Sequence, residues 1–508
     1  MSLASSRQDI ERFRTAIIER IGLNFDDGRL GFLGEVLQRR LHRLGQTSDL
    51  YLQELERQPA DKEFTALARE LTVGETYFFR NIEQFRALAE IVLPARMNAR
   101  RPISSLRLLS AGCASGEEPY SMAIVAKETI AEPGWNVEIR AVDINPAVIQ
   151  KAQQARYSSW ALRETPPDVQ DKWFRPDGRD IVLDPSIRAA VEFTEANLAG
   201  DDPNLWRPSY YDVIFCRNVL MYFSAEQMRA VIDRVAKSLA PGGFLFLGHA
   251  ETLRNVSDQF HLHHSHATFY YSVRDYAELV ERPLVQIVPR SLSGSLEAAF
   301  DTPPVALDQT WYQAIAKATE RVAALVPDRP RDDAPTAQPL LAWNLAPAFD
   351  LMRQERFADA LNHIRARPSI ASKDPDVLLL EATLLAHSGQ LTAAEDSCLS
   401  LLLLDEFNAG ARYVLALCRE HAGEIERAME HDRVASYLDP EFAMPRLHLG
   451  LLVARTGDRA QARRELGRAL ELLKREDASR LLMFGGGFNR EALMVLCSSA
   501  LKDNGGEP

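Results

Sequence analysis

The chain has 508 residues, a net charge of −12 at pH 7, a hydrophobic fraction of 46% and five scattered cysteines. Its length predicts several domains, its acidic charge argues against a nucleic-acid-binding role, and no apolar run approaches the roughly 20 residues of a membrane-spanning helix. Because the N-terminus lacks the apolar core of a secretion signal and the cysteines form no CxxC pair, we expect a cytoplasmic protein without a disulfide framework or a zinc site.

Residues 1–90 are predicted to form an N-terminal helical domain, because apolar residues recur there at three- and four-residue steps. One segment, residues 36–44, is basic and amphipathic. It carries Arg39, Arg40 and Arg43 about one helical turn apart. A solvated basic surface is the ordinary interpretation of these arginines.

Residues 91–275 alternate short β-rich runs with helical patterns, which indicates a parallel α/β sheet. Helices are expected at residues 120–129 and 225–239, and a turn at residues 241–243. Residues 153–190, rich in proline, tryptophan and charge, are predicted to form an inserted subdomain. The strands are expected at residues 106–110, 137–143, 191–193, 212–216, 244–247 and 268–273.

A repeat with a 34-residue period fills residues 341–475. Gly389, Gly423 and Gly457 are each 34 residues apart, and an alanine follows each of them after five residues. This pattern is typical of tetratricopeptide (TPR) repeats, in which small residues let two antiparallel helices approach each other. The sequence therefore predicts an all-α TPR solenoid, and a generic helical bundle with chance spacing is the alternative.

The segments on either side of the repeats have a different character. Residues 276–340 contain recurring prolines and are predicted to be a linker, with a short helix expected at residues 311–325. Residues 476–508 are predicted to form a helical tail. Within this tail, Phe484-Gly485-Gly486-Gly487-Phe488 lacks the context of a phosphate-binding loop and is interpreted as a hinge before the last helix.

The loop from Ser110 to Glu118 joins a predicted strand to a predicted helix, where a Rossmann-like fold brings backbone close to a ligand. Its two carboxylates and the lack of a P-loop lysine would repel a bare triphosphate and favour a cationic amine, such as that of a methionine moiety. The second strand ends at Asp143, whose carboxylate can accept hydrogen bonds from ribose hydroxyls. An adenosine cofactor of either the nicotinamide or the methionine type fits, and a helix N-cap is the alternative role for Asp143.

Four segments carry a family resemblance: LTVGETYFFR at 71–80, GEEPYS at 116–121, FCRNVLMYF at 215–223 and GHAE at 248–251. In order and spacing they resemble the motifs of CheR methyltransferases, which transfer a methyl group from S-adenosylmethionine to glutamate side chains of bacterial chemoreceptors. The resemblance covers roughly residues 5–275 and implies a Rossmann-like class I methyltransferase domain with a small β-subdomain insertion. The TPR extension is similar to that of family members of the WspC and FrzF types.

The resemblance implies roles for individual residues. Arg80 and Tyr222 would lie beside the transferred methyl group and act in catalysis, Glu117 would hold the methionine amine, and Asp143 would bind the ribose. Gly74 departs from the family pattern, because some members carry an asparagine there that touches the cofactor. The implied cofactor-binding residues are Thr76, Arg80, Glu117, Asp143, Asn197, Leu198, Asn218 and Val219. The implied substrate-binding residues, which would attract an acidic receptor helix, are Arg39, Arg40 and Arg43.

The implied partners are a chemoreceptor cytoplasmic domain as substrate and an unidentified protein bound by the TPR repeats. A glutamate carboxylate is already ionised at pH 7, so the implied displacement needs no general base. Two alternatives remain: a catalytically idle methyltransferase fold that serves as a scaffold, and a nucleic-acid or small-molecule methyltransferase. The second is disfavoured because residues 216–219 lack the Asn/Asp-Pro-Pro-Tyr/Phe run of amino-methylating DNA enzymes.

Overall fold

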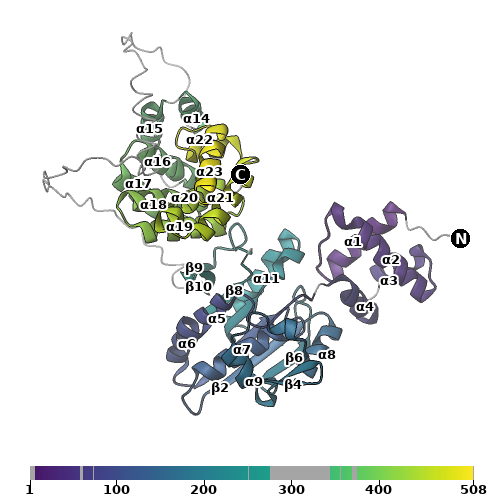
Figure 1. Cartoon of the computed structure of the whole chain (residues 1–508). Helices are drawn as coiled ribbons and strands as arrows, with labels where there is room; N and C mark the ends of the chain where they lie inside the picture. Colours follow the sequence, from purple (N-terminus) through teal and green to yellow (C-terminus); the bar gives the residue numbers. More distant parts are fainter. Residues whose placement is uncertain are drawn as a thin grey trace, which may run out of the picture. The chain divides into compact units, whose positions relative to one another are not determined.

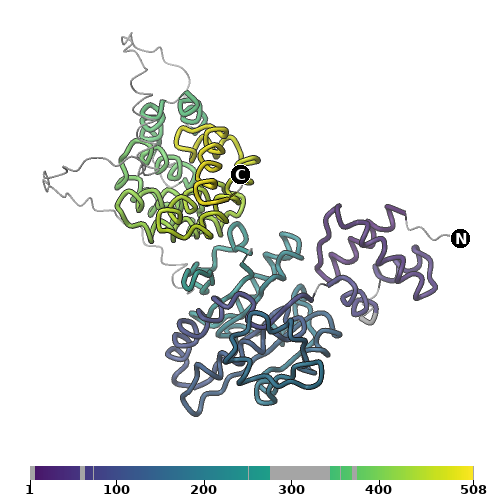
Figure 2. The backbone as a smooth tube through the Cα atoms, in the orientation of Figure 1, coloured from purple at the N-terminus to yellow at the C-terminus, as the bar shows by residue number. Residues whose placement is uncertain are grey.

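The computed structural model divides into two compact units, Met1–Pro283 and Leu284–Pro508, which are described separately below (Figures 1 and 2). The linker predicted at residues 276–340 and its short helix lie outside the described residues. No helix in the described parts of the chain is long and apolar enough to cross a membrane. The residues that the structure describes are 6–57, 61–72, 74–249, 251–274, 344–354, 356–368 and 374–506.

The first unit begins with a bundle of helices that has its own apolar core. Ser6 and Asp9 start the first helix with reciprocal side chain–backbone hydrogen bonds of 3.0 and 3.1 Å. The core includes Phe13, Leu37 and Tyr51, all buried, and ends at Leu71. The helices are α1 (Arg7–Arg20), η1 (Asp27–Arg29), α2 (Leu30–Leu44), α3 (Ser48–Arg57) and α4 (Asp61–Leu71).

A seven-stranded sheet follows, in the order β6-β2-β1-β7-β8-β10-β9. The first five strands in this order are parallel, and β10 and β9 close the sheet as an antiparallel hairpin. The alternating pattern therefore predicted the sheet correctly. The strands are β1 (Ser105–Ala111), β2 (Asn136–Asp143), β6 (Val191–Glu195), β7 (Tyr211–Cys216), β8 (Leu239–Leu247), β9 (Phe260–Ser265) and β10 (Thr268–Val273).

The turn predicted at residues 241–243 was wrong. These residues lie inside β8, at a register shift in its pairing with β7 between Tyr211 and Val213. Gly243 makes the irregularity possible, because a Cβ there would lie 2.8 Å from the carbonyl oxygen of Ala240. The Pro-Gly-Gly run therefore forms an irregularity within a strand that continues, which is a common role of glycine within strands.

The helices around the sheet include α7 (Glu117–Thr129), α8 (Pro146–Gln154) and α11 (Ala225–Ser238). A continuous helical run precedes β1: α5 (Ile82–Ala87), the π-helical η2 (Leu88–Val92) and α6 (Leu93–Arg100). Its buried residues Phe85, Leu88 and Val92 belong to the core of the sheet. The domain boundary predicted at residue 90 thus falls inside a run that covers the sheet, whereas the core of the N-terminal bundle ends at Leu71.

A buried carboxylate ties this helical run to the sheet. Asp212 accepts hydrogen bonds from Arg96 at 2.7 and 3.1 Å and from Arg100 at 2.7 Å. Its second oxygen accepts the backbone N–H of Arg107 at 3.0 Å. Asp212 is 1% exposed, so its charge is balanced almost entirely by these partners.

The predicted inserted subdomain contains a three-stranded antiparallel sheet in the order β3-β5-β4. A tight turn with Gly178 at φ 65° joins β4 to β5. The β-subdomain predicted from the resemblance is therefore present. Its elements are β3 (Arg156–Tyr157), η3 (Ser159–Leu162), α9 (Pro167–Trp173), β4 (Phe174–Asp177), β5 (Asp180–Leu183) and α10 (Pro185–Arg188).

Within the second unit, residues 346–473 fold into helix pairs wherever the structure describes them, as the 34-residue period predicted. Gly389, Gly423 and Gly457 lie at the turns within three pairs, at φ values of 73°, 78° and 94° that favour glycine. The alanines five residues later, Ala394, Ala428 and Ala462, are fully buried. The pairs are α14 (Ala346–Arg353) with α15 (Phe357–Arg365), α16 (Pro375–His387) with α17 (Leu391–Leu404), α18 (Ala409–His421) with α19 (Ile425–Leu438), and α20 (Ala443–Thr456) with α21 (Arg459–Leu473).

Two more helices end the chain. The short α22 (Ala478–Phe484) and the final α23 (Arg490–Asp503) are joined across the glycines at residues 485–487. Helix α23 packs against α21. The glycine run therefore separates two helices, as predicted from its sequence context.

Candidate functional site

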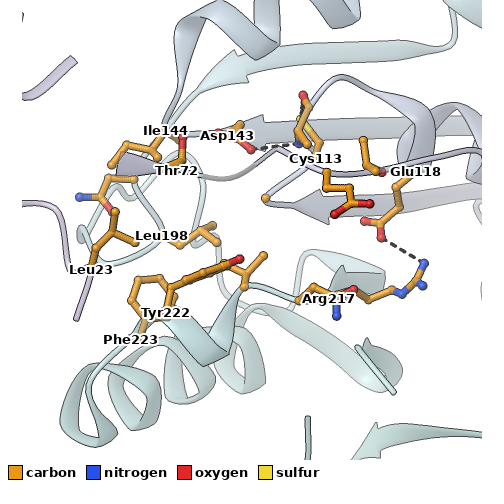
Figure 3. Close-up of a pocket in the computed structure, with 18 of the residues that line it drawn as sticks. Leu23, Thr72, Cys113, Glu118, Asp143, Ile144, Leu198, Arg217, Tyr222 and Phe223 are labelled. Atoms are coloured by element: carbon orange, nitrogen blue, oxygen red, sulfur yellow. Dashed lines mark hydrogen bonds and ion pairs between the residues drawn. The ribbon is translucent and has the colours of Figure 1, made fainter. Parts of the chain in front are cut away.

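A pocket opens at the carboxyl ends of β1, β2 and β7 (Figure 3). Its lining includes Gly112 after β1, Asp143 at the end of β2 and Asn218 after β7, together with Ile21 and Leu23 from the N-terminal bundle. The carboxyl edge is where open α/β sheets bind their ligands. Figure 3 shows Glu118 and Arg217 toward one end of the pocket and Leu23 toward the other.

The glycine loop after β1 forms one wall. Gly112 has φ 81°, and a Cβ there would lie 2.4 Å from a methyl carbon of Val219. Gly116, at φ 94°, leads into α7 and would place a Cβ 2.8 Å from that of Ala152. Only glycine therefore lets this loop pass so close to the segment after β7 and to α8.

Asp143 links this loop to the end of β2. Its two oxygens accept backbone N–H groups of Ala114 and Asn145, each at 2.9 Å. Burial raises the pKa of the Asp143 carboxyl, and these backbone hydrogen bonds oppose the shift. The cap of α8 is Asn145, whose side chain accepts the N–H of Ala147 at 3.0 Å. Asn145, and not Asp143, is therefore the N-cap of α8. Asp143 lies in the pocket lining.

The two adjacent glutamates at the start of α7 lie differently, and Glu117, the one predicted to hold the methionine amine, lines an adjoining cavity that shares Thr76 with this pocket. Glu118 lines the pocket, whereas Glu117 lies outside this lining, with its carboxylate 2.8 and 3.0 Å from the Ser115 hydroxyl. Glu118 accepts the Ser110 hydroxyl at 2.7 Å and pairs with Arg217 at 3.3 Å. Successive residues of a helix point about 100° apart, so the two side chains line different parts of this region.

Burial raises the pKa of the Glu118 carboxyl, and the nearby charge of Arg217 lowers it. Arg217 is itself buried and donates to the Arg80 carbonyl at 2.6 Å and to the Asn81 side chain at 2.7 Å. It thereby braces a turn in which Phe79 and Asn81 have φ values of 57° and 60°. Arg217 lies within the segment 215–223, whose sequence does not indicate that this arginine is buried.

The other predicted site residues come together in the pocket. Arg80 reaches into the lining and donates to the Glu75 carbonyl at 3.1 Å. Tyr222, in η4 (Leu220–Tyr222), lines the same pocket and also packs against the core of the N-terminal bundle. The remaining predicted residues in the lining are Thr76, Asn197, Leu198, Asn218 and Val219.

A buried glutamate shapes the segment after β7. Glu251 accepts the N–H of Asn218 at 2.7 Å, that of Gly248 at 2.8 Å and that of Met221 at 3.3 Å. Asn218 has φ 57°, an uncommon backbone conformation for a residue with a side chain. Glu251 thus holds the backbone that presents Asn218 and Val219 to the pocket, and sequence reasoning had assigned it no role.

The basic surface predicted on α2 is smaller than expected. Arg40 is buried, and its guanidinium donates two hydrogen bonds to Glu63 at 2.7 and 2.8 Å. It also pairs with Glu70 at 3.4 Å. Arg40 therefore belongs to the bundle's interior and not to a docking surface. Arg39 and Arg43 remain on the exposed side of the helix, where Arg39 donates to Glu70 at 3.0 Å.

The contribution of the N-terminal bundle to the pocket was not predicted. The N–H of Asn24 donates to the Tyr222 carbonyl at 2.7 Å, and Leu23 forms an isolated antiparallel bridge with Phe223. Gly22 lies at the junction, where a Cβ would lie 2.7 Å from that of Ala199. A glycine between two apolar residues is a weak sequence signal, and it could not have indicated which surface they meet.

Comparison with known proteins gives consistent relatives. Residues 74–269 match the family model described as CheR methyltransferase, SAM binding domain. The chain is 35% identical over 258 residues to Chemotaxis protein methyltransferase 2 of Vibrio cholerae, covering 50% of this chain and 88% of that protein. It is 31% identical to Chemotaxis protein methyltransferase of Salmonella typhimurium, covering 51% and 89% of the two chains. Probable biofilm formation methyltransferase WspC of Pseudomonas putida is 29% identical over 466 residues, covering 90% of this chain and 97% of that one.

Proposed function

The chain belongs to the CheR family of S-adenosylmethionine-dependent methyltransferases, and we propose that it methylates glutamate side chains of a chemoreceptor cytoplasmic domain. The observation that carries this proposal is the pocket at the carboxyl edge of the sheet. It combines a close-packed glycine loop with two partly buried carboxylates, Asp143 and Glu118. Two relatives whose names state that they are chemotaxis protein methyltransferases support the choice of substrate class.

The pocket residues fit the chemistry of S-adenosylmethionine. We propose that Asp143 accepts hydrogen bonds from the ribose and that Glu118 balances the positive methionine amine. Thr76, Asn197, Leu198, Asn218 and Val219 complete the proposed binding set. S-adenosylmethionine supplies, when bound, a methyl group activated by a positively charged sulfur.

The proposed work of the protein is to align the acceptor and exclude water. Arg80 presents a planar fork of donors that suits a carboxylate, so we assign it the orientation of the substrate glutamate. The Tyr222 hydroxyl is proposed to donate a further hydrogen bond. Arg39 and Arg43 are proposed to attract the acidic receptor helix.

Replacing Arg80 with alanine is expected to leave S-adenosylmethionine affinity largely unchanged and to reduce methyl transfer at least tenfold, which is about 1.4 kcal/mol of transition-state stabilisation. The reason is that the proposed role concerns the acceptor carboxylate. Calorimetry measures the affinity, and single-turnover transfer to a receptor domain measures the rate. Unchanged transfer by a folded variant would show that Arg80 only holds the Glu75 carbonyl.

The two adjacent glutamates provide a matched pair for the binding site. Glu118→Gln is expected to weaken S-adenosylmethionine binding by roughly 1–3 kcal/mol, because a charged, partly buried acceptor is lost. Glu117→Gln changes the neighbouring carboxylate, which lines the adjoining cavity and not this pocket, so the loss of affinity is expected to be smaller than for Glu118→Gln. Equal losses in calorimetry for both variants would contradict the assignment of Glu118.

The substrate class is tested by incubating the full chain with methyl-labelled S-adenosylmethionine and candidate receptor cytoplasmic domains. A carboxyl methyl ester is expected, which base treatment releases as labelled methanol. Label retained after base would indicate a different acceptor atom. Absence of label on every receptor tested, with cofactor still bound, would favour the idle scaffold instead.

We also propose that the helical repeats bind a protein partner and that the chain acts in the cytoplasm. Stacked helix pairs commonly present an extended surface to peptides or helices. The proposed division of the chain is an N-terminal helical domain, a methyltransferase domain to residue 275, a linker, the repeats at residues 341–475 and a helical tail.

A further inference from the structure

The short helix α22 lies against the first helices of the repeat pairs and not at the end of the stack. Phe484, its last residue, is buried, and its ring centroid lies 5.0 Å from that of Phe442 and 5.9 Å from that of Tyr413. Phe442 caps α20 and Tyr413 belongs to α18, while α16 also contacts α22. One short helix thus touches three successive pairs.

The surface beneath Phe484 is shaped for an aromatic ring. At Gly410, on α18, a Cβ would lie 2.9 Å from the ring carbon Cζ of Phe484 and 3.0 Å from Leu379. The Tyr413 hydroxyl lies 3.5 Å from the Phe484 carbonyl. A glycine inside a helix destabilises the helix by up to about 1 kcal/mol relative to alanine. The space that Gly410 leaves for the Phe484 ring explains why a glycine stands at this position.

A charged contact accompanies the aromatic one. Arg480 lies four residues before Phe484 and forms ion pairs with Asp439 and Glu476. Its guanidinium also lies 5.0 Å from the Phe442 ring centroid. Asp439 is 8% exposed, so the surface offers a largely buried carboxylate beside the apolar contact, whereas Glu476 belongs to the segment that leads into α22.

We propose that the face formed by α16, α18 and α20 is a docking groove for a short helix of a partner protein, and that α22 occupies this groove within the chain itself. The recognised chemistry is the one α22 displays: an arginine, a leucine one position later and an aromatic residue four positions later. Residues four apart lie on the same face of a helix, so Arg480 and Phe484 can engage the groove together. A partner helix of this kind can bind in the groove only after it has displaced α22.

The test uses the full chain and a fluorescent peptide of residues 476–488. The double variant Leu481→Ala/Phe484→Ala loosens α22, so it is expected to bind this peptide at least tenfold more tightly than the wild type, as measured by anisotropy. The control Val495→Ala, at a side chain 69% exposed on α23, is expected to behave as the wild type. A peptide carrying Phe484→Ala is expected to lose the binding.

A double variant that keeps its helical circular dichroism and yet binds the peptide no better than the wild type would overturn the proposal. If the double variant unfolds, amide hydrogen exchange of the wild-type chain is measured instead, to compare the protection of α22 with that of the repeat helices. Faster exchange in α22 than in α20 and α21 supports a displaceable occupant. Equal protection of all three helices would make α22 a permanent part of the core and contradict the proposal.

Discussion

Asp212→Ala is expected to lower the free energy of unfolding of the N-terminal unit by about 3–5 kcal/mol. The substitution removes the carboxylate that accepts two hydrogen bonds from Arg96 and one from Arg100. It also removes the acceptor of the Arg107 N–H. Because Arg96 is 4% exposed, its charge would stay buried without a carboxylate partner. Urea unfolding of the full chain, followed by tryptophan fluorescence, measures the change.

The matched control is Asp201→Ala, because Asp201 is an exposed carboxylate that precedes the same strand. Its effect is expected to stay within about 0.5 kcal/mol, as for most surface substitutions. A loss of less than about 1 kcal/mol in Asp212→Ala would mean that water or a rearranged helix satisfies the arginines. The attachment of α6 to the sheet would then not depend on this carboxylate.

Glu251→Ala is expected to reduce methyl transfer about a hundredfold or more, although Glu251 is absent from the pocket lining. Three backbone N–H groups, those of Asn218, Met221 and Gly248, would lose their acceptor. Each buried unsatisfied group costs about 1–3 kcal/mol, whereas a hundredfold rate loss corresponds to about 2.7 kcal/mol. The segment that presents Asn218 and Val219 is therefore expected to shift before the whole unit unfolds.

The rate of methyl transfer to a receptor domain is measured for each variant, together with its affinity for the cofactor and its thermal unfolding. Glu251→Gln keeps one acceptor oxygen and is expected to fall between the wild type and the alanine variant. Glu226→Gln, at an exposed position of α11, serves as the control. Full activity of a folded Glu251→Ala would show that the uncommon backbone conformation of Asn218 persists without its anchor.

Features that depend on local periodicity were predictable from the sequence. The three repeat glycines lie at their turns with positive φ, and Asp143 lies at the end of β2 in the pocket lining. Each follows from rules that involve a few neighbouring residues: the end of a helix, or the carboxyl edge of a parallel sheet.

Features that depend on which face a side chain presents were not predictable. Glu117 and Glu118 are adjacent in sequence, and only the packing of α7 decides that Glu118 faces the pocket. The sequence alone indicates that Arg40 is a surface cation. In the structure its guanidinium donates hydrogen bonds to Glu63, which lies on another helix. Such pairings join residues far apart in the chain, and a single sequence carries no record of them.

The pocket is divided between two hydrophobic cores, because Ile21 and Leu23 come from the N-terminal bundle while Asp143 and Asn218 come from the sheet. Any ligand that touches both sides must bind more tightly when they are joined. Thermodynamic reciprocity then requires that the ligand strengthen the junction by the same factor by which the junction strengthens the ligand. We therefore expect a cofactor bound in this pocket to strengthen the packing of the N-terminal bundle, which also carries Arg39 and Arg43, against the sheet domain.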